Sequence, residues 1–186
     1  MKEEINKAKE ILKSGGLILY PTDTVWGIGC DATNPKAVKK VYALKQREDS
    51  KALICLVAHQ AMLERHVKEV PDAAYDIMDL ATKPTTIIFD HPVGIAHNLI
   101  ASDDSIAFRV ASDKFCQYLL NKFGKPIVST SANISGFPTP KSFKDISPEI
   151  LKGVDYVVNL PDENKDPSPS SIIKLSNDGL VKVIRE

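Results

Sequence analysis

Residues 20–32 read YPTDTVWGIGCDA and follow Leu17–Tyr20, a short apolar run that predicts a buried strand. The segment after this strand is rich in hydroxyl groups, glycines and carboxylates, and strand ends are common ligand sites in sheets that carry helices. The polar side chains of residues 22–24 can bond a ligand amine or carboxylate. The same composition also suits a tight turn whose hydroxyls bond within the turn itself. Both interpretations stay open at this point.

Helices and strands alternate along most of the chain. Helical spacing over residues 5–12 stops at Ser14–Gly16, and Asn34–Pro35 supplies an N-cap and a first residue for the next helix. Ser176–Gly179 is a hairpin signal between the last two strands. The other expected elements are strands over residues 53–57, 85–89, 105–110, 127–130, 154–160, 172–175 and 180–184, and helices over residues 61–67, 71–81 and 115–123. This order predicts a mixed α/β fold with helices packed on a mixed sheet. No linker divides the chain, so one domain is expected over residues 1–186.

The composition limits the classes of function. Hydrophobic residues make up 43% of the chain, enough for a packed core, and Lys plus Arg equals Asp plus Glu at 24 each. The whole molecule therefore has no net field that would attract nucleic acid, and any polyanion site must be a local cluster. Three widely spaced cysteines contain no CxxC pair, which argues against a zinc site. No apolar signal segment opens the chain and the longest apolar run, residues 52–58, is too short for a bilayer, so a cytoplasmic protein with no membrane partner is expected.

A cluster of cations marks the end of one predicted helix. Lys45, Arg47 and Lys51 lie within seven residues, directly before a predicted strand. Cations at a helix C-terminus can simply compensate the helix dipole. Three of them beside a strand edge can also hold a triphosphate.

A second hydroxyl-rich segment follows the strand predicted over residues 127–130. Residues 124–136 read GKPIVSTSANISG, which brings Ser131 and Asn133 to the end of a buried strand. Small hydroxyl and amide groups followed by glycine suit a phosphate or ribose site. A serine nucleophile is the rival interpretation, but it needs a histidine base, and the four histidines show no such pattern.

One arginine interrupts an apolar strand. Strand alternation turns Arg109, in the sequence IAFRV, to the face opposite Phe108 and Val110. It is either an exposed strand residue or a clamp for a carboxylate or phosphate. Ser170 and Arg185, near the end of the chain, give no signal by themselves.

Together these segments resemble the YrdC/Sua5 family, the threonylcarbamoyl-AMP synthases. The two most specific motifs are YPTDTVxGxGxDA and STSANxSGxPxP, and both occur here. The matching stretches occur in family order and cover nearly the whole chain: YPTDTVWGIGCDA, KQREDSKAL, KPTTIIF, IAFRV, KPIVSTSANISGFPTP, PSSIIKL and VIRE. The extra domain of the longer members has no counterpart in these residues, so the expectation is the short, single-domain form.

The resemblance implies a twisted mixed β-sheet flanked by helices, with a deep positive cavity. It also implies roles for nine residues. Lys45 and Arg47 match catalytic phosphate-binding cations, and the substrate-binding or nucleotide-binding residues are Thr24, Lys51, Arg109, Ser131, Asn133, Ser170 and Arg185. Leu56 stands where many members of the family have a histidine that contacts threonine.

The activity implied by the resemblance is that of L-threonylcarbamoyladenylate synthase, a nucleotidyltransferase. It would consume L-threonine, bicarbonate or CO2, and ATP, with Mg2+ expected beside ATP and no metal site built from the protein's own residues. The product would pass to a tRNA-modifying transferase complex that makes threonylcarbamoyladenosine. The alternative is a double-stranded RNA-binding or ribosome-associated module of the same fold, against which the neutral overall charge argues.

Overall fold

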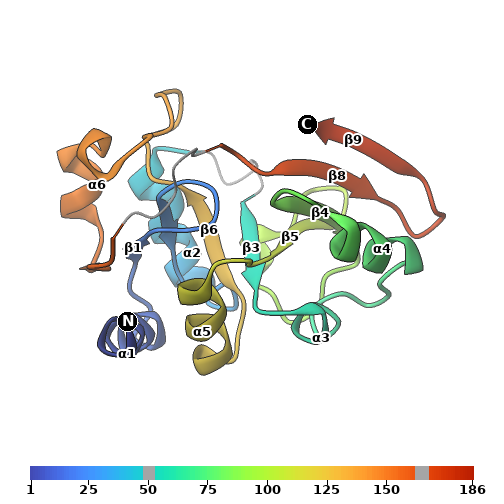
Figure 1. Ribbon diagram of the computed structural model, residues 1–186, viewed down its shortest axis with the longest axis horizontal. Helices are drawn as coiled ribbons and strands as arrows, with labels where there is room; N and C mark the ends of the chain where they lie inside the picture. The colour runs from blue at the N-terminus through green and yellow to red at the C-terminus, as the bar shows by residue number, and fades with distance from the viewer. Residues whose placement is uncertain (48–52, 162–167) are drawn as a thin grey trace.

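The computed structural model describes residues 1–47, 53–161 and 168–186. Its described strands form one mixed sheet in the order β7-β1-β2-β6-β3-β5-β4-β8-β9 (Figure 1). Three neighbouring pairs are parallel (β1 with β7, β3 with β5, β4 with β8) and the other five are antiparallel. The mixed α/β sheet predicted from the sequence is therefore confirmed. The strand bounds are β1 Ile18–Tyr20, β2 Gly27–Gly29, β3 Ile54–Val57, β4 Thr85–Asp90, β5 Ser105–Val110, β6 Ile127–Ser131, β7 Tyr156–Val157, β8 Ser171–Leu175 and β9 Val181–Arg185.

Local capping interactions set the ends of several helices. Asn34 caps the second helix, since its side chain accepts hydrogen bonds from the backbone N–H groups of Lys36 and Ala37. Gly124 ends another helix with φ of 79°, a left-handed conformation that glycine adopts without steric cost. None of the described helices is both long and apolar enough to cross a membrane. The helix bounds are α1 Lys2–Lys13, α2 Pro35–Lys45, α3 Gln60–Leu63, α4 Asp72–Leu80, α5 Lys114–Phe123 and α6 Pro148–Gly153, with the 3-10 turns η1 His97–Leu99 and η2 Phe143–Asp145.

The core lies between the sheet and these helices. Helix α1 packs against α5 and against β1, and α2 packs against α6 (Figure 1). The central strands bury nearly all their side chains, including Leu56 of β3 and Phe108 of β5, which are 1% and 2% exposed. A buried sheet of this kind fixes the polar groups at its strand ends, and these groups form the site described below.

Three elements differ from the sequence prediction. Strand β2, with the sequence GIG, lies inside the segment interpreted as a turn or ligand loop, because three residues with two glycines carry almost no alternation signal. Helix α6 was not predicted, although Ser147 caps it and Pro148 begins it. The strand expected over residues 154–160 is reduced to β7. Each of these elements is set by pairing or packing with distant segments.

Gly29 in β2 provides a test of this close packing. A Cβ atom there would lie 2.7 Å from Cε1 of Tyr20 and 2.9 Å from the carbonyl oxygen of Val128. We predict that Gly29→Ala lowers the free energy of unfolding by about 1–3 kcal/mol, because the backbone cannot yield without strain. Gly27→Ala is the control, since its nearest neighbour would be Ser129 Oγ at 3.3 Å. Equal urea-unfolding midpoints for the two variants would contradict the packing described for β2.

Candidate functional site

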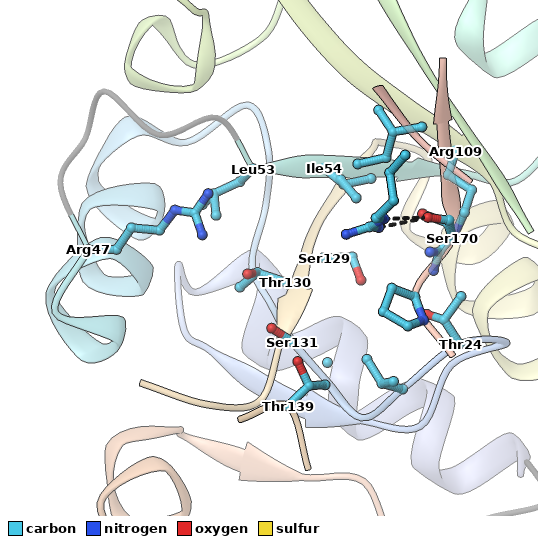
Figure 2. A pocket seen from close by; sticks show the side chains of 15 residues that line it. Thr24, Arg47, Leu53, Ile54, Arg109, Ser129, Thr130, Ser131, Thr139 and Ser170 are labelled. Atoms are coloured by element: carbon cyan, nitrogen blue, oxygen red, sulfur yellow. Dashed lines mark hydrogen bonds between the residues drawn. The ribbon is translucent and has the colours of Figure 1, made fainter. Parts of the chain in front are cut away.

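A cavity of about 230 Å³ opens where several strand ends meet (Figure 2). The β1–β2 loop, the start of β3, the end of β6 and the β8–β9 hairpin all contribute to its wall. Arg47 enters from the side opposite to Arg109 and Ser170 (Figure 2). Six of the nine predicted site residues line this one cavity: Thr24, Arg47, Arg109, Ser131, Ser170 and Arg185.

The TDT segment contains both a turn and a cavity wall. The Thr22 hydroxyl donates to the carbonyl oxygen of Val25 at 2.8 Å and accepts from the backbone N–H of Thr24 at 3.0 Å. These bonds close the turn, as the alternative interpretation of this segment proposes. This turn places Thr24 in the cavity wall, where its hydroxyl oxygen lies 3.0 Å from that of Thr22.

Arg109 is a buried cation, 4% exposed, and so is not the exposed strand residue that the sequence allows as an alternative. Its Nη2 lies 2.9 Å from Oδ1 of Asp23, whose side chain is only 7% exposed. The other oxygen of Asp23 accepts hydrogen bonds from the backbone N–H and the hydroxyl of Ser112, at 3.1 and 2.7 Å. The Nε group of Arg109 has no hydrogen-bond partner among the described residues. A buried donor without a partner, in a side chain that lines a cavity, is suited to an anionic ligand.

Arg185 and Ser170 are held together by the β8–β9 hairpin. Nε and Nη2 of Arg185 donate to the carbonyl oxygen of Ser170 at 2.9 and 2.7 Å, drawn as dashed lines in Figure 2. The Ser170 hydroxyl shares a hydrogen bond of 2.8 Å with the Thr86 hydroxyl. Burial, with the nearby charge of Arg109, lowers the pKa of Arg185 from its usual value. The charge of Arg109 therefore disfavours that of Arg185, and an anion bound beside both would offset this repulsion.

Lys45 points to the protein backbone and does not line the cavity. Its Nζ donates to the carbonyl oxygens of Ser131 and Asn133, at 2.5 and 2.6 Å. The backbone N–H of Ser135 bonds to the carbonyl oxygen of Lys45 at 2.8 Å. Burial, followed by the charge of Arg47, lowers the pKa of Lys45 to about 8. Lys45 thus connects the end of α2 to the loop after β6.

The remaining predicted residues lie elsewhere. Asn133 lines a neighbouring hollow of about 500 Å³, which shares Thr139 with the cavity. Its Nδ2 donates to the carbonyl oxygens of Ile134 and Phe137, and its buried Oδ1 has no partner within the described residues. Lys51 lies outside the residues that the structure describes, as do residues 162–167 of the polar segment before Ser170.

The charges of the described wall are all positive. Arg47, Arg109 and Arg185 are its ionisable residues, and no acidic side chain is among the described lining residues. Such a wall binds anions, and its many hydroxyls add hydrogen bonds to phosphate or carboxylate oxygens. The described part of the chain contains no group of three or more His, Cys, Asp or Glu residues that could hold a metal ion.

Several lining residues were not among the predicted ones. Ser129 and Thr130 belong to the hydroxyl-rich strand end, so the motif already contained the signal for them. Ile172 could be inferred from strand alternation after Ser170. All but one of the others belong to the quoted matching stretches, but only the folded chain shows which residues of those stretches reach the wall. They are Val25, Gly27, Leu53, Thr139 and Pro169, and the one outside these stretches is Ile54.

Known proteins resemble this chain in both sequence and fold. Residues 10–186 match the Sua5_yciO_yrdC family, described as "Telomere recombination". A threonylcarbamoyl-AMP synthase of Vibrio campbellii is 34% identical over 182 residues, covering 92% of this chain and 97% of the relative. The crystal structure of E. coli YciO superposes with a TM-score of 0.85 at 26% identity, covering all of this chain and 90% of that one.

Another similar structure contains an amino acid. It is P. abyssi Sua5 complexed with L-threonine, which superposes with a TM-score of 0.82 at 26% identity. The match covers 92% of this chain, which spans half of the length of the P. abyssi chain.

The lowered pKa of Lys45 predicts a pH-dependent stability. Between pH 8 and about 10.5 the unfolded chain keeps a proton on Lys45 that the folded chain has lost, so this residue makes unfolding harder as the pH rises. We predict that the unfolding free energy of the wild type, minus that of Lys45→Met, increases by up to about 3 kcal/mol across this window. Urea unfolding at pH 7.5 and 10 measures the difference.

Lys40→Met is the control for this measurement, because Lys40 is an exposed lysine on the same helix. Its difference from the wild type should be the same at both pH values. A Lys45→Met difference that is also independent of pH would show that the ammonium of Lys45 is as stable in the folded protein as in water.

Proposed function

The chain belongs to the Sua5–YciO–YrdC family, and from this premise and the geometry of its cavity we propose that it is an L-threonylcarbamoyladenylate synthase. It would be a nucleotidyltransferase that makes threonylcarbamoyl-AMP and pyrophosphate from L-threonine, bicarbonate or CO2, and ATP. The observation that carries the proposal is the convergence of Arg47, Arg109 and Arg185 on one hydroxyl-lined cavity without an acidic side chain among its described residues.

The reaction proceeds in two steps that need little covalent help from the protein. The threonine amine attacks the carbon of CO2 and loses a proton, giving a carbamate. A carbamate oxygen then attacks the α-phosphorus of ATP, and the bond to the bridging oxygen breaks, releasing pyrophosphate. Positioning of the two substrates and neutralisation of the phosphate charge provide the catalysis, as in phosphoryl transfer generally.

The side chains of the wall divide this work. Arg47 and Arg185 neutralise phosphate oxygens, and Ser131 orients the nucleotide from the end of β6. Thr24 and Ser170 supply hydroxyls for the amino acid, Lys45 supports the wall through the backbone carbonyls that it bonds, and Lys51 is a further phosphate-binding cation in this proposal. Mg2+ would arrive on the triphosphate, held by phosphate oxygens and water, since Mg2+ usually keeps several waters and few protein ligands.

The proposal extends to the cell. The product carries a reactive mixed anhydride, so a tRNA-modifying transferase that takes it directly is the expected partner, and a cytoplasmic location suits such a pathway. The alternative of a double-stranded RNA-binding module is not favoured, because the three arginines face a cavity of small-molecule size. A duplex is bound by cations spread over a surface that follows its phosphates.

Arg47 provides the first test. We predict that Arg47→Ala lowers kcat/KM for ATP by about tenfold to a hundredfold, the usual loss for one charge-assisted hydrogen bond to phosphate. The assay follows threonine-dependent pyrophosphate release and identifies the adenylate, made from 13C-bicarbonate, by mass. Arg65→Ala is the control, because Arg65 is exposed and does not line the cavity. Wild-type turnover by Arg47→Ala would remove this residue from the site.

Discrimination between threonine and valine provides the second test. Valine has the shape of threonine without the hydroxyl, and a site that bonds a hydroxyl rejects such an isostere by up to about 10⁴-fold. Leu56 is buried and is not among the described lining residues, so we attribute the discrimination to the wall hydroxyls, with Thr24 and Ser170 the first candidates. We predict kcat/KM at least about a hundredfold higher for threonine. Equal product yields from the two amino acids would show that no wall hydroxyl bonds the substrate side chain.

A further inference from the structure

Asp23 has a buried carboxylate beside the cavity, and the proposed reaction gives this carboxylate no role. It lies between Thr22 and Thr24 but is not one of the residues that line the cavity. Its side chain instead contacts the back of the wall, where Oδ1 lies 2.9 Å from Nη2 of Arg109. Ser112, in the loop after β5, donates two hydrogen bonds to Oδ2. Oδ2 is therefore hydrogen-bonded by the loop after β5, while Oδ1 forms an ion pair with Arg109 and has no hydrogen-bond partner among the described residues.

A second carboxylate near this pair has fewer polar partners than Asp23. Asp113 is the other carboxylate nearby, and its Oδ1 accepts the backbone N–H of Cys116 at 2.8 Å. Burial raises the pKa of Asp113, and the charge of Asp23 raises it further. Its Oδ2 has no hydrogen-bond partner among the described residues. Asp23, by contrast, has the ion pair with Arg109 and two hydrogen bonds from Ser112.

We propose that Asp23 is a positioning residue, which holds the guanidinium of Arg109 so that its unpartnered Nε side faces an anionic oxygen of a bound substrate. A guanidinium clamped by a carboxylate at one nitrogen loses its freedom to rotate, so less entropy is lost when the ligand binds. Ser112 fixes the carboxylate, and through it the arginine. This inference rests on the proposed function for the identity of the substrates, whose anionic groups are the threonine carboxylate and the ATP phosphates.

The chain contains a matched control in Asp31. Its side chain is also 7% exposed, and one of its oxygens lies 2.9 Å from Nζ of Lys125. The other oxygen accepts hydrogen bonds from the backbone N–H and the hydroxyl of Thr33, at 2.8 and 2.7 Å. Asp31, like Asp23, thus has one oxygen in an ion pair and the other bonded by a hydroxyl and a backbone N–H, although Lys125 also donates a hydrogen bond to Asp31. The difference is that Lys125 is half exposed and does not line the cavity, whereas Arg109 does.

The experiment compares Asp23→Asn with Asp31→Asn by steady-state kinetics, varying threonine and ATP separately. We expect Asp23→Asn to raise KM about tenfold or more for the substrate whose anion Arg109 binds, the loss typical of a weakened bond to a charged group. Asp31→Asn should leave both KM values unchanged. The substrate whose KM changes distinguishes the carboxylate from the phosphates. Equal kinetics for the two variants would overturn the proposal.

A second measurement separates positioning from an independent role. If Asp23 acts through Arg109, adding Asp23→Asn to Arg109→Met should cause no further rise in KM. A further rise equal to that in the wild-type background would overturn the proposal. Ser112→Ala with Thr33→Val as its control repeats the comparison while keeping both carboxylates, and decides the question if Asp23→Asn does not fold. Of these two variants, only Ser112→Ala should raise the KM that Asp23→Asn raises.

Inorganic pyrophosphate, measured by calorimetry, separates this inference from the proposed function. A wild type that binds pyrophosphate but shows no threonine-dependent turnover would refute the proposed reaction. Weaker pyrophosphate binding by Asp23→Asn, with Asp31→Asn unchanged, would then still support the positioning role. Absence of pyrophosphate binding in the wild type would overturn the proposed phosphate site and, with it, the positioning of Arg109 towards a phosphate.

Discussion

The buried ammonium of Lys45 joins the two segments from which the cavity is made. Its two hydrogen bonds to carbonyl oxygens connect the end of α2 with the loop after β6, 86 and 88 residues further along the chain. Arg47 follows Lys45 by two residues, and Ser131 supplies one of the bonded carbonyls while lining the cavity. The relative placement of Arg47 and Ser131, the proposed phosphate-binding cation and nucleotide-binding hydroxyl, thus depends on a cation that is itself outside the cavity wall. Such a bond is strong because donor and acceptor lie away from water.

The arginines of the wall also have acceptors beside them. Burying guanidinium groups without counter-ions is costly, and the fold limits the cost by pairing them with these acceptors. Asp23 neutralises Arg109, and the carbonyl oxygen of Ser170 accepts two bonds from Arg185. Asp23 does not line the cavity, so the side of Arg109 away from it remains available to a ligand, whereas Ser170 and Arg185 both belong to the wall. An anionic ligand completes these interactions, and this gain contributes to its binding free energy.

Much of this arrangement could be predicted from the sequence, and the exceptions have physical causes. The helix caps at Asn34 and Gly124 are local, so the sequence predicted both ends correctly. Strand β2 was not predicted, because three residues with two glycines show no alternation of apolar and polar side chains. It forms by pairing with β1 and β6. Convergence of the hydroxyl-rich motifs followed from strand ends meeting at one edge. The direction of the Lys45 side chain could not be predicted. Helical spacing gives the face of the helix on which a residue lies, but not the carbonyl oxygens that its side chain reaches.

The TDT segment shows why a motif is more than a set of ligand contacts. Thr22 closes the turn, Asp23 bonds behind the wall, and Thr24 faces the cavity. The structure shows the tight turn at Thr22, and Thr24 lies in the cavity wall, as the ligand-loop interpretation expects. Because the turn sets the direction of the residues that follow, replacing Thr22 would disturb the cavity without removing any group from it. Three adjacent residues with three separate roles leave little room for substitution at any of them.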